Sequence, residues 1–123
     1  MRIYCDSSVK EACIVIEEPK TTKVVAYAQR VTNNVGEYLA VILAINEAVQ
    51  LGIKDVEILT DSQLVVNQVN GSWQCRAIPL LPLRDIVRRM LKITGVTLTW
   101  IPRELNLAGH VLDKRAAEVK RQS

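Results

Sequence analysis

The sequence has few residues of the kinds that break or crosslink a chain. Of 123 residues, four are proline, five are glycine and three are cysteine, whereas 49% are hydrophobic and 24% are charged. This composition excludes collagen and differs from that of a disordered chain. The cysteines, Cys5, Cys13 and Cys75, are odd in number and lack metal-ligand spacing. We therefore expect buried free thiols rather than a disulfide framework or a thiolate zinc site.

Long hydrophobic runs are also missing. The longest stretches, such as LAVILAI at residues 39–45, fall well short of the roughly 18 residues of a membrane span, and the N-terminus lacks a signal-peptide pattern. We therefore expect a cytoplasmic protein without a membrane partner. A chain of 123 residues has room for one core, so we expect a single domain over residues 1–123. We also expect a monomer, because no segment indicates an interface.

The net charge of +3 hides an asymmetry between the two halves of the chain. Residues 1–61 contain six Lys or Arg and nine Asp or Glu, whereas residues 62–123 contain ten and four. An acidic half suits a cation and a basic half suits a polyanion, a combination found in metal-dependent enzymes that act on phosphates. Solvated faces that differ by chance explain the same counts.

Hydrophobic periodicity predicts nine elements. Three short β-branched stretches, within residues 2–6, 12–18 and 23–30, predict an antiparallel meander. Apolar residues then recur at spacings of three and four, which predicts a long helix ended by Gly52. This helix covers residues 34–51, and the remaining expected elements are strands over 55–60 and 96–101 and helices over 61–71, 82–94 and 106–121. The order β-β-β-α-β-α-α-β-α predicts an α/β fold with one mixed five-stranded sheet flanked by helices.

The third predicted helix has two distinct faces. Its apolar stripe consists of Leu83, Ile86, Val87, Met90 and Leu91. The opposite ridge is basic, and further basic residues lie near the C-terminus; the set comprises Arg84, Arg88, Lys92, Lys114, Arg115, Lys120 and Arg121. These side chains suit phosphate contacts, although solvated helix faces explain them equally well.

Three carboxylates are expected to meet at one place. Asp6 ends the first predicted strand, Asp61 ends the fourth, and Glu37 lies in the first turn of the long helix. Crowded carboxylates repel each other, so such a cluster is normally held by a cation, and oxygen ligands suit Mg²⁺ or Mn²⁺. Each residue also has an ordinary alternative: Asp6 begins a turn, Glu37 forms a capping box with Asn34, and Asp61 caps a helix.

Four segments resemble a known family. IYCDSS, TNNVGEYLAVILAINEAVQLG, LTDSQLVVNQVNG and WIPRELN are similar to the type 1 ribonuclease H family, in its short form without the extra basic loop. The resemblance spans the whole chain and implies a ribonuclease H-like fold. It also implies endonucleolytic hydrolysis of the RNA strand of RNA–DNA hybrids, with 5′-phosphomonoester products.

The resemblance assigns roles to individual residues. It implies that Asp6, Glu37 and Asp61 bind two Mg²⁺ or Mn²⁺ ions, with Asp6 bridging them. Two such ions activate a water and stabilise the leaving 3′ oxygen, so no protein nucleophile is required. The implied hybrid contacts are Asn33, Asn34, Gln63 and Asn106. Asn and Gln side chains can read 2′-hydroxyls without reading sequence, although Asn33 and Asn34 are also ordinary loop and cap residues.

Two departures from the family stand out. The segment that begins at Asp6 is DSSVKEA, without the usual glycines. The last helix of the family normally has the pattern N-x-x-A-D-x-L, whereas here Asn106 is followed four residues later by His110, the only histidine. We expect His110 to replace the fourth acidic ligand. Asp113, nearly one turn further along, is a displaced ligand, a partner of His110 or a surface charge.

The missing carboxylate leaves other functions open. One is a catalytically weak or inactive module that binds RNA–DNA hybrids, and another is a structural or protein-binding domain that kept only the fold. The segment in which some relatives have a loop histidine contains Arg103 and Glu104. Trp73, after the second helix, is expected either to pack in the core or to stack on a sugar or base of the DNA strand.

Overall fold

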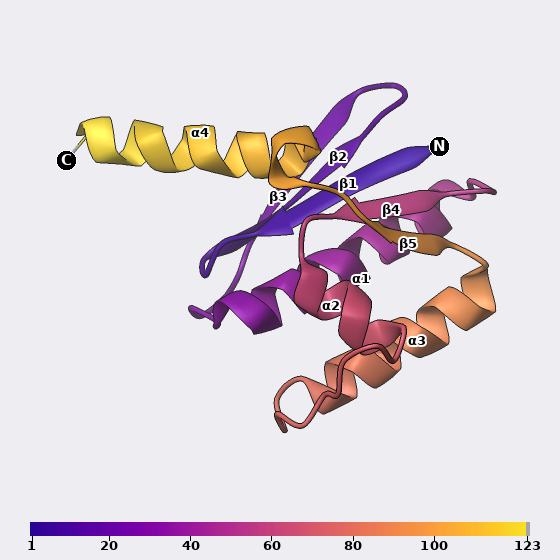
Figure 1. The fold of residues 1–123 in the computed structure, drawn as a ribbon. Helices are drawn as coiled ribbons and strands as arrows, with labels where there is room; N and C mark the ends of the chain where they lie inside the picture. Colours follow the sequence, from indigo (N-terminus) through magenta and orange to yellow (C-terminus); the bar gives the residue numbers. More distant parts are fainter. Residues whose placement is uncertain (123) are drawn as a thin grey trace.

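The computed structural model describes residues 1–122 and contains the nine predicted elements in the predicted order, together with one short 3₁₀ turn (Figure 1). The elements are β1 Arg2–Ser7, β2 Glu11–Ile16, β3 Thr21–Ala26, α1 Asn33–Leu51, β4 Glu57–Thr60, α2 Gln63–Val69, α3 Leu81–Thr94, β5 Thr97–Trp100, η1 Arg103–Leu105 and α4 Leu107–Gln122. The α/β fold class is thereby confirmed.

The five strands form one mixed sheet in the order β3-β2-β1-β4-β5. β1–β2 and β2–β3 are antiparallel, whereas β1–β4 and β4–β5 are parallel. In the parallel pair of β1 and β4, Tyr4 lies beside Leu59. Asp6 and Asp61 each follow two residues later, so this register brings the two carboxylates to the same edge of the sheet.

Helices cover both faces of the sheet (Figure 1). α1 packs against one face, where Ile3 and Cys5 of β1 join the larger hydrophobic core, and α3 packs against α1. α4 lies on the other face, where Ala108 and Leu112 pack against Cys13 and Val15 of β2. Because successive side chains of a strand point to opposite faces, Asp6 points to the face covered by α4.

The start of α1 differs slightly from the prediction, whereas its end does not. The helix begins at Asn33, one residue earlier than expected, because Thr32 has an extended backbone and its hydroxyl accepts from the Val35 amide over 3.2 Å. Thr32 is therefore the N-cap, which rules out the alternative in which Glu37 forms a capping box with Asn34. Gly52 ends the helix with φ of +64°, as expected.

The cap of α2 was also assigned to the wrong residue. Ser62, not Asp61, accepts from the Val65 amide, over 3.2 Å. Both residue types are good N-caps, but the helix begins at Gln63, so Ser62 is the residue whose side chain reaches the third amide of the helix. The Asp61 carboxylate is therefore available to other partners.

Two further element boundaries differ from expectation, whereas the prediction for the cysteines is confirmed. β3 ends at Ala26 rather than Arg30, because its partner β2 begins at Glu11, which pairs with Ala26. α4 begins at Leu107, and Asn106 caps it by accepting from the Ala108 amide over 3.1 Å. Cys5, Cys13 and Cys75 are free and buried, which confirms that prediction. No helix within residues 1–122 is long and apolar enough to cross a membrane.

Candidate active site

Asp6 and Asp61 meet at the edge of the sheet where β1 and β4 end. Asp6 is buried, with 7% of its side chain exposed, and the Asp61 side chain is 13% exposed. Both carboxylates accept from the same nitrogen of Arg103: Nη1 lies 2.6 Å from Asp6 Oδ2 and 2.9 Å from Asp61 Oδ2. The two predicted ligands therefore converge on a single positively charged group.

Arg103 belongs to the short turn η1, and its guanidinium reaches a third carboxylate. Nη2 donates to Asp113 Oδ1 over 2.8 Å. The Arg103 side chain is 45% exposed and Asp113 is 65% exposed, so this part of the site faces solvent. Asp113 is thus the partner of Arg103, whereas the sequence suggested a ligand, a partner of His110 or a surface charge.

Asn106 fixes the position of Asp61 from within the protein. Its Nδ2 donates to Asp61 Oδ2 and to the carbonyl of Cys5, each over 3.0 Å. Its Oδ1 accepts from the Ala108 amide, and the residue is fully buried. All the polar atoms of this side chain are therefore engaged within the chain, which assigns Asn106 to positioning rather than to the predicted hybrid contact.

Glu37 approaches the aspartates from α1. Its Oε2 accepts from the Ser62 hydroxyl over 2.7 Å, so the residue that caps α2 also orients this carboxylate. Glu37, Asp61 and Arg103 line one shallow cavity of about 400 Å³, together with Ser62, Gln63, Leu64 and Trp100. Three residues that sequence analysis assigned to the site, Glu37, Asp61 and Gln63, thus share one opening.

The pKa values at this site reflect burial and crowding. Burial raises the pKa of Asp6, the hydrogen bond from Arg103 lowers it, and the Asp61 charge raises it, with a net rise. The pKa of Glu37 is also raised, first by burial and then by the charges of Asp6 and Asp61, against a hydrogen bond from Ser62. Negative charge is thus unfavourable here without a compensating cation.

The carboxylates of Asp6, Glu37 and Asp61 have the chemistry of divalent-cation ligands. In this structure, however, Arg103 contacts two of them, Asp6 and Asp61. Asp6 and Asp61 already direct one oxygen each to a common positive group, and carboxylate oxygens are the ligands that Mg²⁺ and Mn²⁺ prefer. Within residues 1–122, however, no group of three His, Cys, Asp or Glu side chains is close enough together to hold a metal ion. A metal would therefore require local rearrangement, in which Arg103 moves.

Four further residues were predicted for the site, and all four are exposed: Asn33, Asn34, Gln63 and His110. His110 is exposed in the first turn of α4, where its amide donates to the Asn106 carbonyl over 3.1 Å. Asn33 and Asn34 are exposed at the start of α1, and Gln63 is exposed at the start of α2. No interaction of these side chains fixes their roles, so the ligand and hybrid-binding assignments remain predictions.

Two residues of the site, Arg103 and Trp100, were not predicted from the sequence. Trp100 lines the cavity and its indole N–H donates to the Asp61 carbonyl over 3.1 Å. Both lie in the segment WIPRELN, which the sequence had already linked to the family. The break at Pro102 marks the end of β5, but no local signal indicates that these side chains reach the end of β4.

Two predictions outside the site are changed by the structure. Trp73 is 46% exposed, so the expected core packing against prolines was wrong: the residue lies in the loop between α2 and α3.

Arg88 was expected on the basic ridge of its helix, but it donates to the carbonyls of Gln68 and Val69, over 3.0 and 2.9 Å. It thereby joins α3 to the end of α2.

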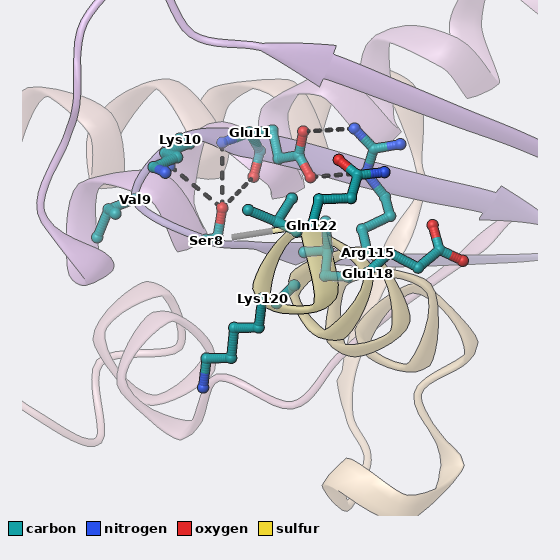
Figure 2. A pocket seen from close by; sticks show the side chains of 11 residues that line it. Ser8, Val9, Lys10, Glu11, Arg115, Glu118, Lys120 and Gln122 are labelled. Carbon is teal, nitrogen blue, oxygen red and sulfur yellow. Dashed lines mark hydrogen bonds and ion pairs between the residues drawn. The ribbon is translucent and has the colours of Figure 1, made fainter.

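A second cavity, of about 460 Å³, lies away from Asp6, Glu37 and Asp61, between the β1–β2 turn and α4. Figure 2 shows Arg115 of α4 paired with Glu11 at its rim, with Nε and Nη2 donating over 2.8 and 2.9 Å. Arg115 is thus used in an ion pair. The cavity lining includes Lys120, which, like Arg115, was expected to suit phosphate contacts, but none of the residues predicted to bind metal or to contact the hybrid.

Comparisons with known proteins place this geometry in a family. A family model described as reverse transcriptase-like matches residues 4–116. Ribonuclease HI of Halobacterium salinarum is 36% identical over 92 residues, which cover 72% of this chain and 45% of that protein. The bifunctional protein Rv2228c of Mycobacterium tuberculosis is 34% identical over 95 residues, which cover 76% of this chain and 26% of that protein. The chain therefore spans about a quarter to a half of the length of these relatives.

Solved structures show the same fold. RNase H1 of Halobacterium salinarum superposes with a TM-score of 0.73 at 28% identity, covering 91% of this chain and 94% of that one. The N-terminal RNase H domain of Rv2228c gives 0.69 at 28% identity, covering 87% and 90%. LC11-RNase H1, solved in complex with an RNA/DNA hybrid, gives 0.71 at 24% identity over 86% and 88%, a likeness of fold alone. The chain thus belongs to the reverse transcriptase-like family and has the fold of type 1 ribonuclease H, which confirms the resemblance found in its motifs.

Proposed function

We propose that this chain is a metal-dependent endoribonuclease that hydrolyses the RNA strand of RNA–DNA hybrids and leaves 5′-phosphomonoesters. The observation that supports this most directly is the convergence of Asp6 and Asp61 on one cationic group, beside a cavity that Glu37 also lines. Similarity to ribonuclease HI of Halobacterium salinarum supports the same reaction class.

Asp6, Glu37, Asp61 and His110 are the residues that would hold two ions, either Mg²⁺ or Mn²⁺. When bound, such ions supply an activated water and stabilise the leaving 3′ oxygen. The protein keeps these ligands in place through neighbouring polar groups: Asn106 holds Asp61 by its amide, and Ser62 holds Glu37 by its hydroxyl. Supporting hydrogen bonds of this kind orient metal ligands and raise their effectiveness.

Hybrid binding is assigned to three exposed amides. Gln63 lines the cavity at the start of α2, two residues after Asp61, and Asn33 and Asn34 lie at the start of α1, within four residues of Glu37. Their donors and acceptors suit the 2′-hydroxyls of a wide minor groove. Recognition of this type depends on the sugar rather than the base, so it distinguishes RNA from DNA without sequence preference.

The proposal is tested by incubating a labelled RNA–DNA hybrid with Mg²⁺ and, separately, with Mn²⁺. The parent is expected to cleave the RNA strand, and Asp61→Asn, which keeps the size of the side chain, is expected to abolish cleavage. Single-stranded RNA and duplex DNA serve as substrate controls. End-group analysis with a phosphatase checks for 5′-phosphomonoesters. Cleavage that survives Asp61→Asn unchanged would contradict the proposed site.

His110 offers a separate test of the fourth ligand. Imidazole suits Mn²⁺ better than Mg²⁺, so activity should favour manganese. We expect His110→Asp to increase Mg²⁺-supported cleavage and His110→Ala to reduce cleavage in both metals. If His110→Ala cleaves as fast as the parent in both metals, His110 is a bystander and Asp113 becomes the next candidate ligand.

A second candidate function is a hybrid-binding module with little or no catalysis. Two observations favour it: His110 stands where the family motif has a carboxylate, and Arg103 is bound to two of the three remaining ligands. The two candidates separate in one assay, because a module binds the hybrid without cutting it in either metal. We place either activity in a monomer of the cytoplasm, which suits three free thiols.

A further inference from the structure

The guanidinium of Arg103 contacts two of the carboxylates that the proposed function assigns to metal binding. Its Nη1 contacts Asp6 Oδ2 at 2.6 Å and Asp61 Oδ2 at 2.9 Å, so one nitrogen bridges carboxylates from two adjacent strands. A divalent cation bound to the same pair of oxygens would have to take that position. The arginine and the metal are therefore mutually exclusive at these two atoms.

Two features of α4 hold the guanidinium in this position. Asp113, one turn along the helix, accepts from Nη2 over 2.8 Å. Gly109 provides the space: a Cβ atom at this residue would lie 2.7 Å from Nη1 and 2.8 Å from Cζ of Arg103. A side chain at position 109 would therefore require the guanidinium to shift away from the helix.

Electrostatics explain why a cation is needed when no metal is bound. Asp6 is buried, with 7% of its side chain exposed, and it lies beside the charge of Asp61. An ionised carboxylate in such a place is costly unless it is paired. Arg103 supplies that pairing from the solvent side, where 45% of its own side chain is exposed, so it can leave without crossing the core.

We propose that Arg103 is a built-in counter-cation that competes with divalent metal for Asp6 and Asp61, and that Gly109 is required for this competition. The inference rests on the proposed function in that Asp6 and Asp61 bind the metal. For Asp6 and Asp61 to hold a metal, Arg103 would have to give up both Nη1 contacts, and its Nη2 contact with Asp113 could remain. The measured metal affinity is then the intrinsic affinity reduced by the cost of displacing Arg103.

The competition is tested by metal binding in the absence of nucleic acid. Free Mn²⁺ is measured by electron paramagnetic resonance while the parent, Arg103→Gln, Gly109→Ala and Arg115→Gln are titrated at one pH and ionic strength. Arg115→Gln is the matched control, because Arg115 also makes an ion pair, is 48% exposed and lies outside the site. It removes the same charge as Arg103→Gln.

We expect Arg103→Gln to bind Mn²⁺ about tenfold more tightly than the parent, which corresponds to about 1.4 kcal/mol. Gly109→Ala should also bind more tightly, although it leaves the net charge unchanged, because alanine displaces the guanidinium. Alanine is a better helix former than glycine, so this variant is expected to fold. Arg115→Gln should bind within about twofold of the parent, since it only removes a screened surface charge.

Thermal unfolding gives an independent readout. In EDTA, Arg103→Gln should melt below the parent because Asp6 and Asp61 lose their counter-cation. Added Mn²⁺ should then raise the melting temperature of Arg103→Gln more than that of the parent, because at one Mn²⁺ concentration the tighter binder gains more stability. Both changes should be absent from Arg115→Gln.

The inference is overturned if Arg103→Gln and Gly109→Ala bind Mn²⁺ no more tightly than the parent. It is also overturned if Arg115→Gln matches the gain of Arg103→Gln, since the effect would then be one of overall charge. Failure of the proposed function is recognised separately: the parent would not cut hybrids, or Asp61→Asn would cut them as well as the parent, whatever the Mn²⁺ titration shows.

Discussion

The buried amide of Asn106 joins Asp61 to the end of β1: it donates to Asp61 Oδ2 and to the Cys5 carbonyl, each over 3.0 Å. The same side chain caps α4 through the Ala108 amide. One residue therefore connects a proposed ligand, a strand and a helix, and its three hydrogen bonds have no solvent substitute because Asn106 is fully buried.

We predict that Asn106→Ala lowers the free energy of unfolding by about 2 kcal/mol or more. Loss of an N-cap costs about 1 kcal/mol, and a buried carbonyl left without a donor costs about 1–3 kcal/mol. Urea unfolding followed by circular dichroism measures the change. Asn70→Ala is the control, because Asn70 is exposed and only bonds the nearby Ser72 amide. Equal stability of the two variants would contradict the role given to Asn106.

The metal-free protein should become more stable when Glu37 is neutralised. Burial and the charges of Asp6 and Asp61 raise the pKa of Glu37 against the Ser62 hydrogen bond. A raised pKa means that the folded state binds the proton more tightly than the unfolded state, so this stability is present at low pH and is lost as pH rises through the folded pKa.

Glu37→Gln in EDTA should therefore melt at a higher temperature than the parent near pH 7.5, and the difference should shrink as pH is lowered toward 4. Thermal scans at both pH values measure it. Glu104→Gln, an exposed carboxylate in η1, is the control and should show no comparable gain. A lower melting temperature for Glu37→Gln at pH 7.5 would show that the ionised carboxylate is favourable, contrary to the prediction.

The frame of the site could be predicted from sequence because it depends on local periodicity. Alternating β-branched residues defined the strands that end near Asp6 and Asp61, and the spacing of three and four defined the helix that contains Glu37. Parallel pairing of the two strands then follows from the helix between them. These steps use only the order of apolar residues, which is why the fold class was confirmed.

The details of the site could not be predicted, because they depend on contacts between distant segments. Arg103 reaches Asp6 across 97 positions in the chain, and the space it occupies exists only because residue 109 is glycine. No local pattern records such a contact. The assignment of the α2 cap failed for a different reason: Asp61 and Ser62 are adjacent and both suit an N-cap, so propensity could not distinguish them.

Arg88 should contribute to the free energy of unfolding, in addition to any contact with the hybrid. It donates to the Gln68 and Val69 carbonyls at the end of α2, where the last carbonyls of a helix need donors. We predict that Arg88→Ala costs about 1–2 kcal/mol of unfolding free energy, since hydrogen bonds from charged groups contribute about 1.5–3 kcal/mol and the site is partly exposed. The neighbouring Arg89→Ala removes the same charge from an exposed position and should change stability by less than about 0.5 kcal/mol. Similar losses in both variants would contradict this role.

The cysteines should resist alkylation in the folded protein. Burial raises the pKa of Cys13 to about 11, and burial together with the charges of Asp6 and Asp61 raises that of Cys5 further. At pH 8, about one molecule in a thousand then has the Cys13 thiolate, the form that reacts. Mass spectrometry after iodoacetamide treatment should show no rapid labelling of Cys5 or Cys13 in buffer and full labelling in urea. Fast labelling of either residue in buffer would show that it is accessible and ionised.

Trp73 should affect hybrid affinity more than stability. Its side chain is 46% exposed and its amide donates to the Asn67 carbonyl over 3.0 Å, so the backbone of the loop is fixed while the ring remains available. Stacking on a base contributes about 1–3 kcal/mol, which corresponds to a loss of about fivefold or more in affinity for Trp73→Ala. The melting temperature should fall by less than about 4 °C, the change expected for about 1 kcal/mol in a domain of this size.

Fluorescence anisotropy of a labelled hybrid in EDTA measures the affinity of Trp73→Ala without cleavage. Trp73→Phe, which keeps an aromatic ring, should retain most of the parent's affinity. A variant Trp73→Ala that melts early but binds the hybrid as well as the parent would show that the ring serves only the loop.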